Sequence, residues 1–136
     1  MPEAGYSGTP LPKKLGIAAG LRVAALNPPS DYRDLVSPWP KGATLAARAD
    51  AKTDLVHLFV AERAVLAKES KRLREVLKSD AVLWVSWPKK AARVATDITE
   101  DVIREVVLPL GWVDVKVCAV DATWSGLKLL VRKTLR

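Results

Sequence analysis

The sequence predicts a three-layer α/β sandwich with a mostly parallel sheet and an antiparallel hairpin at its C-terminal end. Short apolar runs alternate with segments of helical periodicity. Two of these runs, residues 54–60 and 81–87, are apolar at nearly every position, which is typical of strands covered by helices on both faces. The last two runs, 113–120 and 127–133, are separated by only six residues, so they predict a hairpin. Together these patterns indicate a Rossmann-like fold.

The first part of the chain predicts an extension and two strands. Residues 1–20 are expected to be an N-terminal extension with a short helix, for which Thr9 is a candidate N-cap and Gly16 a candidate C-terminal residue. Residues 22–27 (RVAALN) are an apolar run that two prolines stop, so they predict a buried strand. Residues 44–48 predict a second, weaker strand, because alanine is a poor strand former.

Three helices are predicted between the strands. A short one covers residues 31–36, with Ser30 as its candidate N-cap. Residues 62–78 show the clearest helical pattern, with an apolar stripe opposite a charged face. Thr99 is the candidate N-cap of a third helix, whose first turn carries two acidic residues, as a helix dipole favours.

Composition favours one cytoplasmic, metal-free domain spanning residues 1–136. The chain has 136 residues, of which 49% are hydrophobic, and its apolar runs are far shorter than a membrane span of about 20 residues. A single cysteine, Cys118, excludes an internal disulfide, and with a single histidine, His57, it leaves no metal-ligand cluster. The net charge of +7 makes this a basic protein, but no charge block or basic tail concentrates it.

Residues 15–26 (LGIAAGLRVAAL) and 77–85 (LKSDAVLWV) resemble the first-strand and fifth-strand segments of class I methyltransferases. The closing pair of strands is similar to the last hairpin of that fold. Where those enzymes have a Gly-x-Gly loop that approaches S-adenosylmethionine, this chain has residues 27–31 (NPPSD), whose two prolines remove two amide donors. Asp50 lies about where a ribose-binding acid follows the glycine loop, but this chain lacks the glycines. The resemblance therefore implies the fold and not the cofactor.

A second resemblance covers nearly the whole chain. The blocks GYSGTPLPKKLGI, WVSWPKK, ATDITEDVIREV and LPLGWVDVKVCAVDATWSGLKLLVRK resemble those of a family of small bacterial proteins of unknown function. That family has no assigned activity to carry over, so the resemblance implies no reaction, no cofactor and no site residue for this chain.

Ligands of open α/β sheets bind beyond the carboxyl ends of the strands. The candidate ligand-binding residues at those ends are Asn27, after the first strand, and Trp87, Lys89, Lys90 and Arg93, after a later one. Two lysines and an arginine beside an aromatic ring suit an anion with a stacked base. The alternative is a solvated basic loop without a ligand.

The connector of the final hairpin supplies the remaining candidates. Asp121, Trp124 and Ser125 offer a carboxylate, an indole and a hydroxyl for a recognition loop, although such a tryptophan more often packs on the core. Ser125 has no base partner in the sequence, and we expect His57 to be a hydrogen-bonded core residue and not a general base. No catalytic residue is predicted.

Three functions remain open from the sequence. The first is a non-catalytic Rossmann-like binding or interaction domain, whose partner is an anionic, nucleotide-like small molecule or another protein. The second is a methyltransferase-like enzyme with a degenerate S-adenosylmethionine pocket. The third is a nucleic-acid-associated protein, which the positive charge suggests. The absence of a cofactor loop, a metal site and an acid–base pair favours the first.

Overall fold

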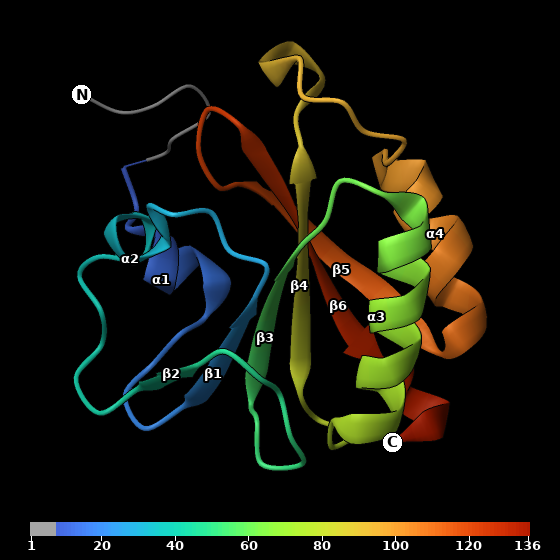
Figure 1. The fold of residues 1–136 in the computed structure, drawn as a ribbon. Coiled ribbons are helices and arrows are strands. Elements are labelled where there is room, and N and C mark those ends of the chain that lie inside the picture. Colours follow the sequence, from blue (N-terminus) through green and yellow to red (C-terminus); the bar gives the residue numbers. More distant parts are fainter. Residues whose placement is uncertain (1–7) are drawn as a thin grey trace.

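The residues described in the computed structural model, 8–136, build a six-stranded sheet with helices on both faces (Figure 1). In spatial order the strands are β2 (Thr44–Ala46), β1 (Arg22–Leu26), β3 (Leu55–Phe59), β4 (Val82–Pro88), β6 (Trp124–Val131) and β5 (Trp112–Ala119). The first four pair in parallel, whereas β6 pairs antiparallel with both β4 and β5. This confirms the predicted mostly parallel sheet and its C-terminal antiparallel hairpin.

Helices cover the two faces in pairs. On one face lie α1 (Leu11–Leu15) and α2 (Tyr32–Leu35), and on the other α3 (Arg63–Val76) and α4 (Glu100–Val107). Figure 1 shows the two pairs on either side of the sheet. Short 3₁₀ turns follow β4, α4 and β6. The arrangement is the three-layer sandwich that the sequence predicts.

Each central strand contributes to two apolar cores, because its side chains alternate between the faces. All five residues of β3 are buried, and Val56 and Leu58 point to the α3–α4 face while Leu55 and Phe59 point to the α1–α2 face. Each such side chain stabilises the fold by about 1.5–3 kcal/mol through burial. The near-continuous apolar runs of the sequence therefore mark strands that are buried on both sides.

Helix α4 begins as predicted, but two other helix starts differ from prediction. Thr99 accepts a hydrogen bond from the backbone N–H of Val102 at 3.2 Å, which is an N-cap contact. Thr9 is not the N-cap of α1, because the extended backbone of Pro10 immediately precedes its first residue. Ser30 is not the N-cap of α2 either, because the helix starts one residue later, after Asp31, with no side-chain cap.

The final hairpin is tighter than predicted. Strand β6 starts at Trp124, three residues before the predicted start at position 127. Asp121 causes the difference, because its Oδ1 accepts hydrogen bonds from the backbone N–H groups of Thr123 and Trp124 at 2.9 and 2.8 Å and closes a short turn. Gly126 is a strand residue and not part of the loop, since it pairs with Ser86 of β4 and Cys118 of β5.

Candidate functional site

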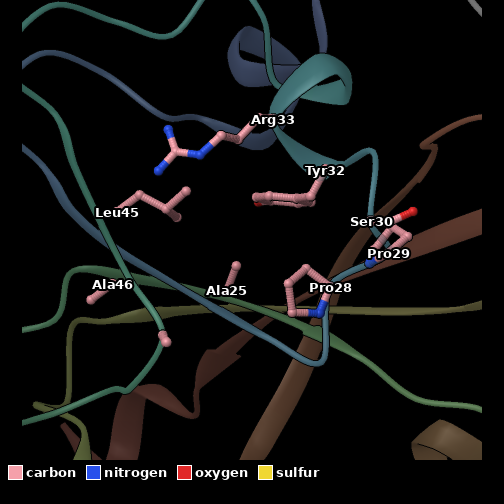
Figure 2. A pocket seen from close by; sticks show the side chains of 9 residues that line it. Ala25, Pro28, Pro29, Ser30, Tyr32, Arg33, Leu45 and Ala46 are labelled. Carbon is pink, nitrogen blue, oxygen red and sulfur yellow. The ribbon is translucent and has the colours of Figure 1, made fainter.

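Two pockets open where the parallel strands end, at the carboxyl edge of the sheet, one on each face. The first, which we call the β1 pocket, has a volume of about 420 Å³ and is lined by Ala25, Pro28, Pro29, Ser30, Tyr32, Arg33, Leu45, Ala46 and Ala47. Figure 2 shows Tyr32 and Arg33 extending over it from α2, with Leu45 and Ala46 of β2 opposite them. Its size falls within the range of small-molecule sites, roughly 300–1,000 Å³.

The loop after β1 shapes one wall of this pocket. Asn27 turns the chain sharply, with a φ of 54°, a left-handed conformation that asparagine tolerates better than most residues. Pro28 and Pro29 follow and have no backbone N–H to offer a ligand. The carbonyl of Pro29 accepts a hydrogen bond from the N–H of Tyr32 at 3.1 Å. The loop is therefore a rigid, mostly apolar wall.

A buried polar chain holds α2 onto the sheet. The Tyr32 hydroxyl lies 3.0 Å from Nδ1 of His57 in β3, and Nε2 of the same ring lies 2.7 Å from Oγ of Ser86 in β4. His57 and Ser86 are fully buried, and Tyr32 is 4% exposed. The structure thus confirms His57 as a hydrogen-bonded core residue. A neutral ring can satisfy both contacts, with one nitrogen donating and the other accepting.

Burial shifts the titration of both ionisable groups in this chain. Desolvation disfavours the imidazolium and lowers the pKa of His57 to about 3. It likewise disfavours the phenolate and raises the pKa of Tyr32. Neither group is a charged general acid or base at neutral pH. Their contribution is positional, because together they hold the first residue of α2 against the sheet.

Arg33 gives the β1 pocket its electrostatic character. The side chain is exposed and forms no ion pair or hydrogen bond within residues 8–136. No carboxylate is among the residues that line the pocket. A guanidinium carries five N–H donors in a planar fork that matches a carboxylate or a phosphate. The pocket therefore combines apolar walls with one cation.

The second pocket, which we call the β4 pocket, lies on the α3–α4 face. It has a volume of about 460 Å³ and is lined by Trp87, Pro88, Lys90, Thr96, Ile98, Thr99 and Glu100. Lys90 is exposed there, while Trp87 is 7% exposed, so little of its ring is available for stacking. Glu100 is already paired with Arg104. This pocket includes both a cation and a carboxylate.

Backbone pairing brings five of the predicted site residues close together, but the side chains of Trp87 and Trp124 pack on opposite faces of the sheet. Trp87 faces Ser125 in the register between β4 and β6, and Trp124 follows one position along, opposite Pro88. The N–H of Lys89 donates to the Thr123 carbonyl at 2.7 Å, which ties the end of β4 to the hairpin turn that Asp121 closes. Trp124 packs edge-to-face on Phe59 at 5.0 Å, as a core-packing tryptophan does.

Of the other predicted site residues, Lys90 lines the β4 pocket with Trp87, whereas Arg93 and Asn27 do not line it. Lys90 belongs to the 3₁₀ turn Lys90–Ala92, and Arg93 ends that turn with a φ of 56°. Asn27 follows β1, which β3 separates from β4. Tyr32, Arg33 and Leu45 line the β1 pocket but were not predicted as site residues. Their sequence position could have indicated Tyr32 and Arg33, because residues that start the helix after the first strand lie at the carboxyl edge of the sheet.

The residues present do not fit S-adenosylmethionine, the cofactor that the methyltransferase resemblance implies. The loop after β1 has prolines where a close backbone approach needs glycine. Asp50 closes its own turn, because its Oδ1 accepts from the N–H of Lys52 at 2.8 Å, and it is not among the residues that line the β1 pocket. Arg33 would repel a sulfonium cation. Nothing in the β1 pocket offsets these three differences.

Two features are absent from the described residues, 8–136. No group of three or more histidine, cysteine, aspartate or glutamate side chains in that range is arranged to hold a metal ion. Within the same residues, no helix has the length and apolar character needed to cross a membrane.

Known proteins resemble this chain in fold, but none matches it as a member of a known family. No protein-family model and no curated protein matches the chain, so the resemblance to a small bacterial family remains a prediction. Among solved structures, the chain is similar to a SAM-dependent methyltransferase from Aquifex aeolicus, with a TM-score of 0.64 and 12% identity over 89% of this chain and 87% of that one. It is also similar to the ribosomal protein L11 methylase of Lactobacillus delbrueckii, with a TM-score of 0.58 and 13% identity over 90% and 76%.

A third neighbour extends the likeness to nearly the full length of both proteins. A protein assigned to the type 11 methyltransferases of Sulfolobus solfataricus matches with a TM-score of 0.64 and 11% identity over 90% of each chain. At such identities the likeness concerns the backbone and not the site. The chain has the Rossmann-like fold of SAM-dependent methyltransferases.

Proposed function

We propose that this chain is a non-catalytic binding domain that takes a small, anionic, nucleotide-like ligand at the carboxyl edge of its sheet. The observation that carries the proposal is the β1 pocket, in which apolar walls and an unpaired guanidinium meet at the edge where α/β sheets bind ligands. Arg33 supplies charge-assisted hydrogen bonds for an anion, and Pro28 and Leu45 supply apolar surface for a base or ring.

The proposal of a non-catalytic role is supported by the chemistry of the side chains near the pocket. Tyr32 and His57 are neutral and hydrogen-bonded to each other, so neither is a proton acceptor poised over the pocket. Ser30 is the residue with an aliphatic hydroxyl among the pocket-lining ones, and it has no histidine partner, since the single histidine of the chain is bonded to Tyr32 and Ser86. An activated nucleophile needs such a base within reach.

The anion could alternatively enter the β4 pocket, where the sequence predicted it. Lys90 lines that pocket, and Lys89 and Arg93 flank it. The paired carboxylate of Glu100 weakens the attraction for an anion there, because it neutralises part of the local positive charge. Both pockets are therefore tested together, with the β1 pocket as the favoured site.

Calorimetric titration of the full-length protein tests the proposed function. AMP and ADP are expected to bind with micromolar to millimolar affinity, on the order of −4 to −8 kcal/mol, and S-adenosylmethionine is expected to bind far more weakly. Tighter binding of S-adenosylmethionine than of either nucleotide would overturn the proposal and favour the methyltransferase-like enzyme. No heat with any nucleotide at about 1 mM would also overturn it.

The nucleic-acid alternative makes a different prediction in the same experiments. Contacts to many phosphates release counterions, so binding of a single-stranded oligonucleotide would weaken steeply as the salt concentration rises. The affinity of a single pocket for one anionic group depends only weakly on the salt concentration. A steep slope with an oligonucleotide, together with no binding of mononucleotides, would favour the nucleic-acid-associated protein over the proposed small-molecule domain.

A further inference from the structure

We propose that the β1 pocket is selective for a ligand with one anionic group and an apolar or aromatic body, with Arg33 binding the anion. The body lies against Pro28, Leu45 and Ala46. This inference rests on the proposed function and names its site and ligand class. The proposed ligand differs in charge from S-adenosylmethionine, the cofactor that the methyltransferase fold implies, since S-adenosylmethionine carries a positive charge at its reactive centre.

Arg33 is the side chain that can select for charge in this pocket. It reaches over the cavity from α2, as Figure 2 shows, and it forms no ion pair with the residues described here. The prolines of the adjoining loop have no amide to bind an anion, so recognition of the anionic group depends on a side chain. Ser30 lines the pocket on the other side of Tyr32, with its hydroxyl pointing outward (Figure 2).

The buried hydrogen-bonded chain of Tyr32, His57 and Ser86 fixes the position of Arg33. Helix α2 has only four residues and no side-chain N-cap, so it has little stability of its own. Its first residue, Tyr32, is bonded through its hydroxyl to His57, which is bonded in turn to Ser86. This contact also directs the Tyr32 hydroxyl away from the ligand and leaves an apolar ring wall. Tyr32 is thus a positioning residue for Arg33.

The ligand class follows from what the pocket offers. Most of its surface is apolar, its lining includes Pro28, Pro29, Leu45 and three alanines, and no carboxylate is present to bind sugar hydroxyls or a cation. A polar, multiply charged molecule would leave groups without partners there, which is costly once they lose water. A nucleoside monophosphate matches this composition when its flat base lies on the apolar wall, its single phosphate meets Arg33 and its ribose hydroxyls stay in water.

The pair AMP and adenosine tests the inference, because the two differ only in the phosphate. With wild-type protein we expect AMP to bind roughly 10- to 100-fold more tightly than adenosine, since a charge-assisted contact is lost without the phosphate. Arg33→Ala should remove this preference and leave adenosine binding unchanged. Arg33→Lys should retain part of it, because a lysine keeps the charge and loses the planar fork.

Two control variants separate failure of the inference from failure of the proposed function. Lys71→Ala removes an exposed charge on α3 that lines neither pocket, and it should leave the preference intact. Lys90→Ala tests the β4 pocket. If Lys90→Ala abolishes AMP binding and Arg33→Ala does not, the site assignment is wrong and the proposed function stands. If wild-type protein binds neither AMP nor ADP, the proposed function itself is wrong.

Tyr32→Phe tests the positioning role without removing the ring. We expect it to lower the AMP-over-adenosine preference several-fold, because α2 loses its hydrogen bond to the sheet while Arg33 remains present. A purely structural role would lower stability in urea and leave the preference unchanged. An unchanged preference in the folded variant would overturn this part of the inference.

Discussion

His57 should make the protein sensitive to mild acid in a way that one substitution removes. Burial lowers the pKa of this imidazole from 6.5 to about 3. As the pH falls below 6.5, the unfolded chain takes up a proton that the folded chain refuses, so the free energy of unfolding decreases. The loss is about 1.4 kcal/mol per pH unit. Between pH 7 and pH 5 it amounts to about 2 kcal/mol, before most carboxylates titrate.

Urea unfolding followed by tryptophan fluorescence at pH 7, 6 and 5 measures this dependence, since the chain has five tryptophans. His57→Gln keeps a hydrogen-bonding side chain without a titrating group, so its stability should be nearly flat over this range even if its absolute value is lower. Because His57 is the single histidine, proton NMR of its ring provides a second readout. A wild-type stability that does not change, or an imidazole that protonates near pH 6.5 in the folded state, would refute the reasoning.

Three further substitutions test the local geometry by urea unfolding. Asn27→Ala should cost about 1–2 kcal/mol because of its positive φ, whereas Asn27→Gly should cost little; equal effects would contradict the strain argument. Asp121→Ala should cost about 1 kcal/mol by freeing two backbone N–H groups, and Asp121→Asn should retain most of the stability, since its amide oxygen can still accept. Gly126→Ala should cost about 1–3 kcal/mol by crowding the Trp84 ring, and a neutral result would mean that the ring can shift.

Most of the fold could be predicted because the composition of the strands distinguishes them from the helices and loops. Residues 54–60 and 81–87 are apolar on both faces, and that pattern fits only a sheet covered on two sides. The start of β6 could not be predicted in the same way. Asp121, Ser125 and Gly126 all favour turns, yet only Asp121 acts as a turn residue. Gly126 is in the strand, where it pairs with Ser86 and Cys118, and a Cβ there would lie 3.3 Å from the Trp84 ring, which only the folded arrangement reveals.

The candidate site was harder to predict, because its residues meet only through tertiary structure. Tyr32, His57 and Ser86 come from a helix and two strands, and none of them carries a motif. In the sequence, nothing distinguishes Arg33 from the many other basic residues of this chain. The proposed anion-binding role of Arg33 depends on its position opposite Leu45 in the pocket. Leu45 belongs to the three-residue strand β2, which the composition indicates only weakly. The basic cluster after β4 was easier to notice, because its charges are adjacent in the sequence.

The loop after β1 shows why a shared fold need not carry a shared ligand. A backbone that binds a cofactor by its amides needs glycines, and Pro28 and Pro29 remove that possibility while leaving the strand and the following helix in place. Recognition at this edge must then come from side chains, and among the residues that line the β1 pocket the charged one is Arg33. Replacing both prolines by glycine would therefore restore amides without creating a site for S-adenosylmethionine, since the guanidinium would still repel the sulfonium and Asp50 would still be held in its own turn.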